Sequence, residues 1–346
     1  MIIKSEKEVL ANAKGKTLEV MDSYINKAEE MSFYWDEYKA VPKGSFPIHL
    51  TDELDVSYMD ASGYAHCGDI SEYAFSQLCG KVGVPAAYIK KCFANGLGEL
   101  AVHNYQEWSR KNLSEDNLLI REYDGVVRAV LSDRYNVFNT ASVLKNLRDA
   151  VEDPRFKNRY ELSQIFMDTD KLHIRFVDFD NKIRVGNTEL NPGFTVSSSD
   201  VGDGSLNIKY FLYRFACTNG IVVVKNGGIL FRQTHLKNFD EIGGTLFVNA
   251  LENMEALNEF SARQVALAEN KHLSMDEMQM YLMRAKRELH IGNKVEKIEE
   301  LLDTTYTDRN LISFIHAITE NAQNYTLATR LEHEKWAGDI LANTAA

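Results

Sequence analysis

Residues 117–131 read NLLIREYDGVVRAVL, in which Asp124-Gly125 separates two runs rich in aliphatic residues. Asp-Gly favours the positive φ angles of a two-residue hairpin turn, so this stretch predicts two paired antiparallel strands. Two further stretches carry a similar signal. Residues 161–179, ELSQIFMDTDKLHIRFVDF, turn at 168–170, and a third hairpin turns at 226–228. The sequence therefore predicts a central antiparallel sheet.

Helical patterns lie on both sides of the predicted strands. Apolar residues recur at helical spacing in 5–31, and three shorter helical segments follow between 69 and 110. From Phe239 to the last residue the pattern is helical throughout, and Ser274 and Glu277 fit a capping box. The strands are therefore expected to lie between two helical parts.

The remaining middle segments are less regular. Residues 181–204 are polar and loop-like, and residues 206–217, LNIKYFLYRFAC, fit either a strand or a buried helix. The fold class expected is α+β, with a central antiparallel sheet flanked by an N-terminal helical part and a C-terminal all-helical part. We expect a core domain of residues 1–238 and an acidic helical region of residues 239–346.

The bulk composition is that of a soluble globular protein, with 45% hydrophobic and 26% charged residues. No run reaches the roughly 18 apolar residues that cross a bilayer. The first residues also lack the apolar core of a signal peptide, so we expect a cytosolic protein with no membrane partner. The four cysteines form no CxxC pair, and neither HExxH nor GxxxxGK[ST] occurs. These absences predict no metal and no cofactor.

The charge is unevenly distributed along the chain. The net charge is −11, yet residues 204–238 contain five basic and no acidic residues. Residues 239–346 contain 18 acidic and 10 basic residues, a net charge of −8. The chain thus combines a locally basic centre with an acidic C-terminal region, and a local basic segment is the pattern that contacts a polyanion.

Residues 213–228, YRFACTNGIVVVKNGG, allow two interpretations. Cys217 and His235 could act as the nucleophile and base of a hydrolase. Cys217 follows an aromatic, apolar run, however, and free cysteines are commonly buried, which favours a structural role. Thr218-Asn219-Gly220 is typical of a tight turn. An exposed Asn219 and its neighbouring amides could instead hold a phosphate or a base.

Basic and aromatic residues are interleaved on the predicted strands. Cations along the phosphates and rings under unstacked bases are what a single-stranded nucleic acid requires. The alternative is that the rings face a core and the arginines pair with acids. No catalytic or metal residue is assigned. The candidate nucleic-acid-binding residues are Arg121, Arg128, Arg134, Tyr135, Lys209, Tyr213, Arg214, Asn219, Arg232 and Lys237.

Five motifs in order make the chain similar to a known family. They are QLCGKVGVPAAY, REYDGVVRAVLSDRYNVF, SSSDVG, LYRFACTNGIVV and FRQTH, which begin at Gln77, Arg121, Ser197, Leu212 and Phe231. Together they resemble the phage- and plasmid-encoded proteins that share the domain of unknown function 932 (DUF932). The third motif departs from the usual NSEVG, with Ser198 and Asp200 in the places of its asparagine and glutamate. The resemblance implies a setting of replication or recombination and supplies no catalytic residues.

We therefore expect a non-enzymatic protein that binds single-stranded DNA, as an annealing or recombination accessory inside a bacterial host cell. The arginines and lysines would contact phosphates, and Tyr135 and Tyr213 would stack under bases. The C-terminal helices would support a homo-oligomer. The alternative is a protein-binding factor that acts on a host or phage protein through the acidic surface, for example in counter-defence.

Overall fold

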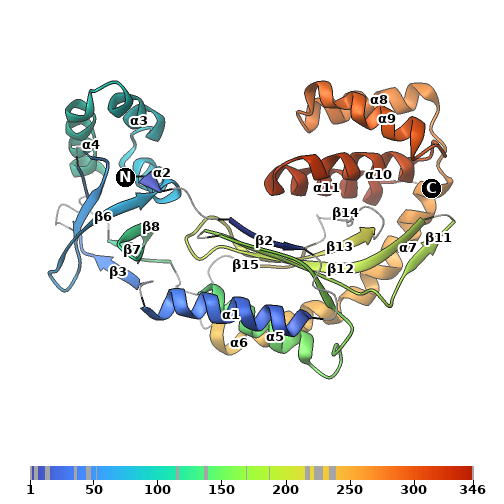
Figure 1. The fold of residues 1–346 in the computed structure, drawn as a ribbon, viewed down its shortest axis with the longest axis horizontal. Coiled ribbons are helices and arrows are strands. Elements are labelled where there is room, and N and C mark those ends of the chain that lie inside the picture. The colour runs from blue at the N-terminus through green and yellow to red at the C-terminus, as the bar shows by residue number, and fades with distance from the viewer. Residues whose placement is uncertain are drawn as a thin grey trace.

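The computed structural model describes residues 2–3, 7–11, 16–34, 37–43, 48–51, 53–113, 117–135, 139–168, 170–186, 188–214, 219–221, 229–233 and 239–344. This part of the chain contains two sheets, the helices that pack against them, and a C-terminal group of helices (Figure 1). The α+β class predicted from the sequence is confirmed, because helices precede and follow a central sheet whose strands are antiparallel.

The N-terminal lobe is built on a mixed sheet with the strand order β3-β7-β8-β6-β5-β4, and β1 lies beside β6. Its strands are β1 (Ile2–Ile3), β3 (Glu37–Val41), β4 (His49–Leu50), β5 (Val56–Met59), β6 (Ala65–Ser71), β7 (Leu118–Tyr123) and β8 (Val126–Ser132). Its helices are α2 (Glu72–Val82), α3 (Ala86–Ala94) and α4 (Gly98–Leu113). These helices bury Phe75, Leu78 and Tyr105 against Ile70 and Ile120, so the lobe has a hydrophobic core of its own.

The hairpin predicted in residues 117–131 is confirmed as β7 and β8, where Ile120 pairs with Val130. Asp124 and Gly125 have φ angles of 49° and 75°, and a two-residue turn of this kind requires positive values at both positions. Strand β6 packs directly beside the turn. A Cβ atom added to Gly68 would lie 2.1 Å from the Gly125 carbonyl oxygen, so glycine is needed for this approach.

The central sheet is antiparallel and follows the path β14-β13-β12-β10-β9-β2, with β11 beside β12 and β15 beside β13. Its strands are β2 (Lys7–Ala11), β9 (Glu161–Asp168), β10 (Leu172–Val177), β11 (Ile183–Val185), β12 (Thr188–Ser198), β13 (Leu206–Arg214), β14 (Asn219–Ile221) and β15 (Ile229–Gln233). One face is covered by α1 (Thr17–Tyr34), α5 (Thr140–Glu152) and α6 (Phe239–Glu252), as Figure 1 shows.

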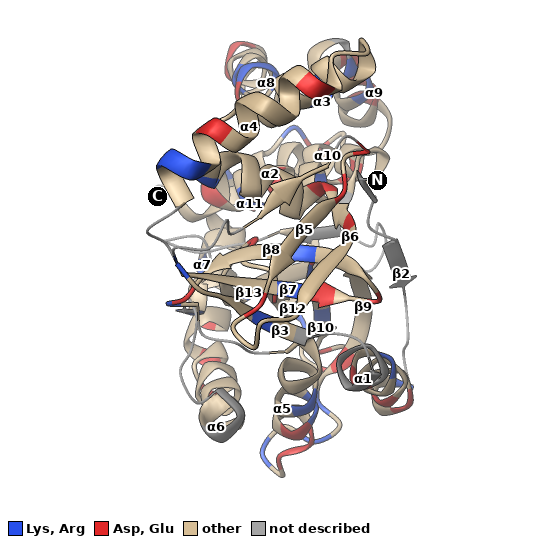
Figure 2. Cartoon of the chain, turned by 90° about the vertical axis from the view of Figure 1, so that its left-hand side faces the viewer, with Lys and Arg blue, Asp and Glu red and all other residues tan. Residues whose placement is uncertain are grey.

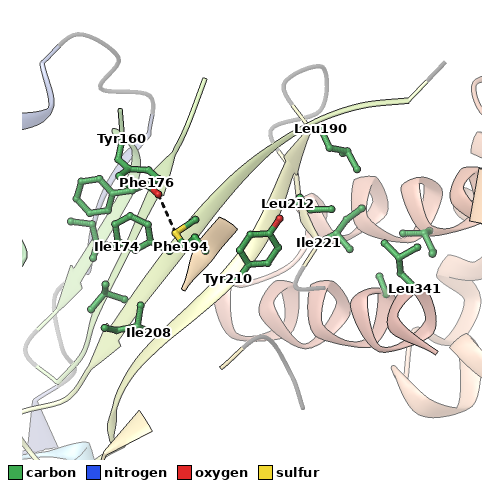
Figure 3. Packing of buried hydrophobic residues seen from close by; sticks show 14 of the residues in the cluster. Tyr160, Ile174, Phe176, Leu190, Phe194, Ile208, Tyr210, Leu212, Ile221 and Leu341 are labelled. Atoms are coloured by element: carbon green, nitrogen blue, oxygen red, sulfur yellow. Dashed lines mark hydrogen bonds between the residues drawn. The ribbon is translucent and has the colours of Figure 1, made fainter. Parts of the chain in front are cut away.

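Strand alternation sends every second side chain of this sheet into the main core. Figure 3 shows the buried side chains that lie there, among them Ile174, Phe176, Phe194, Ile208 and Tyr210. The Tyr160 hydroxyl, which is buried in the same cluster, donates to the Met254 sulfur at 3.4 Å. The intervening residues of the strands face the opposite side of the sheet, where the candidate site lies.

The C-terminal helices share this core. They are α7 (Met254–Asn270), α8 (Met275–Glu288), α9 (Val295–Thr304), α10 (Leu311–Asn321) and α11 (Leu327–Ala342). Ile315 of α10 and Leu341 of α11 belong to the same buried cluster as Leu212 of the sheet, so residues 1–238 and 239–346 are joined by one core. The capping box predicted at Ser274 and Glu277 is confirmed at the start of α8.

No helix in the described segments has both the length and the apolar character that crossing a membrane requires.

Three structural predictions are wrong. The hairpin of residues 117–131, expected in the central sheet, belongs to the mixed sheet of the N-terminal lobe. Residues 7–11 form strand β2, an edge strand paired with β9, and the helix expected over 5–31 begins at Thr17. Residues 188–198, expected to be a loop, form β12 in the middle of the sheet. Residues 206–214 are a strand, which settles the choice between strand and helix. Strands β14 and β15 pair with different halves of β13, and the turn expected at 226–228 lies outside the described residues.

Candidate functional site

A buried carboxylate joins the N-terminal lobe to the central sheet. Asp200 lies in the loop after β12, and its Oδ2 is 3.1 Å from Arg121 Nη1 of β7. Its Oδ1 is 3.4 Å from Arg128 Nη2 of β8. The Thr140 hydroxyl, at the start of α5, donates to the same carboxylate at 2.9 Å. We refer to Asp200, Arg121, Arg128 and Thr140 as the Asp200 junction.

Neighbouring hydrogen bonds hold the Asp200 junction in place. Gln77 of α2 donates to the Val201 carbonyl at 3.0 Å, and its own oxygen accepts from the Val130 N–H at 2.9 Å. The Tyr38 hydroxyl donates to the Asp200 carbonyl at 2.8 Å. Figure 2, viewed toward the N-terminal lobe, shows basic positions on strands in the middle of the molecule. Three of the five sequence motifs, those that begin at residues 77, 121 and 197, thus meet at this junction.

Asp200 keeps its negative charge inside the protein. Burial alone would raise its pKa, but the charges of Arg121 and Arg128 and the hydrogen bonds from Thr140 outweigh burial and hold the pKa below the usual 3.8. Arg121 and Arg128 are only 1% and 4% exposed. The sequence prediction put both arginines on a nucleic-acid-binding surface. In the structure they are buried instead, because a carboxylate from a distant segment neutralises and covers them.

The two predicted stacking residues are also buried. Tyr135 lies in a small buried hydrophobic cluster beside the Asp200 junction. It stacks on Tyr38, with 6.4 Å between ring centroids. Tyr213 packs edge to face on Phe211, also with 6.4 Å between centroids. Their rings fill the interior between sheet and neighbouring segments, so they offer no exposed platform for a base.

The other predicted residues are dispersed. Arg214 donates to the Tyr306 hydroxyl at 2.6 Å and lies over its ring, so it is held against the C-terminal helices. Arg134 is exposed beyond the end of β8. The backbone of Asn219 begins β14 and pairs with Arg214. The side chain of Asn219 and the whole of Cys217, Thr218, His235 and Lys237 lie outside the described part of the chain.

Lys209 and Arg232 belong to a polar face of the central sheet, opposite helices α1, α5 and α6. The register of β10, β12, β13 and β15 aligns side chains on this face in two rows. The rows are Arg175–Thr195–Lys209 and His173–Ser197–Asn207–Arg232. Directly opposed side chains of neighbouring strands have Cβ atoms about 4.5–5.5 Å apart, so these cationic, hydroxyl and amide groups share one face of the sheet.

Helix α11 adds two cations and one carboxylate to this face. Arg175 Nη1 donates to Glu334 Oε1 at 3.2 Å, and Arg330 Nε donates to the same oxygen at 3.0 Å. Burial would raise the pKa of Glu334, but the charges of Arg175 and Arg330 outweigh it and hold the pKa below 4.5. Arg175 and Glu334 are themselves buried, as Arg121 and Asp200 are. Two arginines share one ionised carboxylate, which leaves one positive charge uncompensated, and of the two only Arg330 is partly exposed.

Three more cations extend the same surface. Burial, followed by the charges of Lys335 and Arg232, lowers the pKa of Lys209 from its usual 10.5, which shows that the three charges interact. Within the described ranges none of the three pairs with a carboxylate, and Arg232 Nε donates to the Ser205 hydroxyl at 3.4 Å. We define the basic face as Arg175, Lys209, Arg232, Arg330 and Lys335. Among the described residues, its five cations are opposed by one carboxylate.

His173 lies within the basic face as a neutral imidazole. Burial, followed by the charges of Arg175, Arg330 and Lys209, holds its pKa well below the usual 6.5. Its Nδ1 lies 2.8 Å from the Ser197 hydroxyl oxygen. Its buried Nε2 has no hydrogen-bond partner among the residues that the structure describes. Because His173 is only 5% exposed, this nitrogen is out of reach of an external anion.

The basic face carries an excess of positive charge. In the described part of the chain no group of three histidine, cysteine, aspartate or glutamate side chains is placed to hold a metal ion. The sequence prediction included Lys209 and Arg232 but missed Arg175, Arg330 and Lys335. Alternation within residues 172–177, LHIRFV, was a signal for Arg175. Nothing in the sequence of α11 showed that its cations would lie near the sheet.

Comparison with protein families matches residues 127–340 to the family described as Domain of unknown function (DUF932). This range covers more than half of the chain, includes all five residues of the basic face and continues through the acidic helices. Comparison with curated proteins and with solved structures finds no significant match.

Proposed function

Because the chain belongs to the DUF932 family, whose description assigns no activity, we propose from the geometry of the basic face that the protein binds a single-stranded nucleic acid. The observation that carries this proposal is the excess of four positive charges where five cations meet Glu334. Lys209 and Lys335 have no carboxylate partner among the described residues. Phosphate groups are the anions that such a cluster attracts most strongly.

The binding mode is backbone recognition without base stacking. Tyr135 and Tyr213 are buried, so the bases are left facing away from the protein. Neighbouring strands lie about 4.8 Å apart, and the rows from β10 to β15 therefore extend over roughly 15 Å, which is room for a few phosphates. Contacts to phosphates position a nucleic acid but carry no sequence information, so we expect little sequence preference.

The role that fits this mode is an accessory in annealing, replication or recombination, without a catalytic step of its own. The sequence motifs described above favour that setting. Such a role needs a protein that holds a strand loosely and releases it, and a contact of a few phosphates provides a weak, salt-sensitive grip.

The test is fluorescence anisotropy of labelled oligonucleotides across a salt series. We expect a single strand of about 20 nucleotides to bind near 50 mM salt. The logarithm of affinity should fall against the logarithm of salt with a slope of about −2 to −3, as expected for three or four phosphates on a single strand. Absence of binding at low salt, or binding without a salt slope, would contradict the proposal.

A charge-matched pair of variants assigns the binding to the basic face. One variant carries Lys209→Gln, Arg232→Gln and Lys335→Gln, and the control carries Lys16→Gln, Lys91→Gln and Lys157→Gln, which are exposed elsewhere. Both lose three positive charges, so general electrostatics change equally. We expect at least a tenfold loss of affinity for the first and less than a threefold loss for the control. Equal losses would show that the basic face is not the binding site.

A pull-down after nuclease treatment separates this function from the protein-binding alternative. Partners that survive the nuclease, together with no affinity for oligonucleotides, would favour the alternative.

A further inference from the structure

Two exposed apolar helix faces lie at opposite ends of the molecule, on α4 and on α8 (Figure 1). On α4, Leu100, Trp108 and Lys111 lie along one side of the helix, because residues three, four and eight apart share a face. Trp108 is 44% exposed, and Lys111 Nζ lies 4.9 Å from the centre of its ring. On α8, Met275 and Met283 are 59% and 71% exposed.

A pocket of about 240 Å³ opens between α8 and α9 beside Met275. Its apolar wall includes Met275, Met278, Leu282 and Leu302. Small-molecule sites usually measure about 300–1,000 Å³, so this pocket has the size of an anchor site for one or two side chains. Methionine adapts to the shape of a partner and makes favourable contacts with aromatic rings.

The two ends have complementary charge. Glu299 and Asp303 line the pocket, and neither has an ion-pair partner among the described residues. Arg309 also lines it and donates to the Met275 sulfur at 3.5 Å. Over their full lengths, α8 and α9 contain seven acidic and four basic residues. Helices α3 and α4 contain four basic and two acidic residues.

We propose that the chain assembles head to tail, with Trp108 and Lys111 of one copy docking into the α8–α9 pocket of the next. The indole fills the methionine-lined pocket, and the Lys111 ammonium lies beside Glu299 and Asp303. An exposed tryptophan next to a cation is the kind of anchor that dominates protein interfaces. The contact joins different surfaces on the two copies, so repetition closes a ring or extends a filament. This inference does not depend on nucleic-acid binding.

Sedimentation velocity over a concentration series is the first measurement. The wild-type chain should show species larger than one chain, in increasing proportion as concentration rises. Trp108→Glu and Met275→Glu should each weaken self-association by roughly tenfold or more, because each puts a charge into the apolar contact. Tyr64→Glu, at a 70% exposed position outside both faces, is the control and should assemble like the wild type. A wild-type chain that stays monomeric would overturn the proposal.

Mixing variants distinguishes this arrangement from a symmetric dimer. The Trp108→Glu chain keeps an intact pocket, and the Met275→Glu chain keeps an intact α4 face. At a concentration where the wild type assembles but the weakened variants do not, each alone should be monomeric, whereas their mixture should form a complex of two chains and no larger species. A mixture that stays monomeric would exclude the head-to-tail contact. A double variant with Lys111→Glu and Asp303→Lys should assemble better than either single variant, and failure of this rescue would argue against the lysine–carboxylate contact.

Oligonucleotide anisotropy on the same variants keeps the two proposals separate. The Trp108 and Met275 variants retain the basic face, so their affinity measured below the assembly concentration should equal that of the wild type. If the Trp108 and Met275 variants lose assembly but still bind the oligonucleotide, both proposals are supported. Both are also supported if the basic-face variant loses oligonucleotide binding but still assembles.

Discussion

Single basic residues in this chain have opposite roles, which depend on whether a carboxylate lies within reach. Arg121 and Arg128 converge on Asp200 and are buried, so their charge interacts with a carboxylate inside the molecule. Lys209 and Arg232 lie on the face of the central sheet that helix α11 adjoins, and they interact with further cations. Because their charge is not matched locally, they can interact with an external anion.

Substitution of Asp200 by Asn tests the structural role of the junction. The change leaves two buried guanidinium groups without their counter-charge, and loss of one partner of a buried ion pair costs about 3–5 kcal/mol. Urea unfolding at pH 7 should show this loss of unfolding free energy. Asp180→Asn, at an exposed position, is the control and should change stability by less than about 0.5 kcal/mol.

The difference in unfolding free energy between the wild type and Asp200→Asn should depend on pH, and the pKa of Asp200 gives the sign. The pKa of Asp200 is lower in the folded protein than its usual 3.8. Its contribution to stability is therefore complete above pH 3.8 and is lost as the pH falls through the folded pKa. The difference between wild type and Asp200→Asn should narrow in acid. A difference that is small at pH 7, or that grows in acid, would contradict this assignment.

Among the strands, β12 depends on one close contact across the sheet. A Cβ atom added to Gly193 would lie 2.4 Å from the Phe176 carbonyl oxygen and 2.8 Å from the ring of Phe211. The Phe211 ring thus occupies the space that a side chain at residue 193 would need, and the Arg175 guanidinium lies 5.3 Å from the centre of that ring. Gly193 therefore allows the Phe211 ring to pack against β12, next to Arg175 of the basic face.

Gly193→Ala should lower the free energy of unfolding by about 1–3 kcal/mol, because overpacking forces the ring or the strand to move. Gly80→Ala is the control. Gly80 lies inside α2 with open space around it, and alanine there should be neutral or stabilise by roughly 0.5–1 kcal/mol. Thermal melts of both variants provide the measurement, and equal shifts of the two would refute the role assigned to Gly193.

The sequence correctly predicted the features that depend on residues close together in the chain. The Asp124-Gly125 turn and the Ser274 capping box both depend on neighbours in sequence, and both are present. Strand β12 was missed because Pro192-Gly193 is a loop signal. In the structure the Pro192 carbonyl accepts from the Asp178 N–H at 2.9 Å, and Phe211 packs where a side chain would be. These contacts between strands override the local preference.

The candidate site was predicted only in part for a similar reason. The sequence grouped Lys209 and Arg232 in one basic segment, but it contained no information about Lys335, which is 126 residues further along the chain than Lys209. It also could not show that Arg121 would meet Asp200, a residue 79 positions away. Both outcomes are set by packing between segments that are distant in sequence.

The described part of the chain has two large hydrophobic cores, one in the N-terminal lobe and one shared by the central sheet and the C-terminal helices. The Asp200 junction and the Gln77 bridge connect them. Gln77 bonds to both sides, to Val130 of the lobe and to Val201 of the loop after β12. Loss of this bridge should therefore affect the coupling of the two cores more than the stability of either.

Gln77→Met tests that coupling, because methionine keeps much of the volume and removes both hydrogen bonds. Hydrogen exchange measured by mass spectrometry should show faster cooperative opening of α2–α4 while α7–α11 keep wild-type protection, since only the lobe loses its attachment. Asn112→Met is the control: Asn112 donates to the Val82 carbonyl within the lobe, so its loss leaves the bridge intact. If exchange in Gln77→Met rises equally in both regions, the two cores unfold as one unit and the junction is not the connection between them.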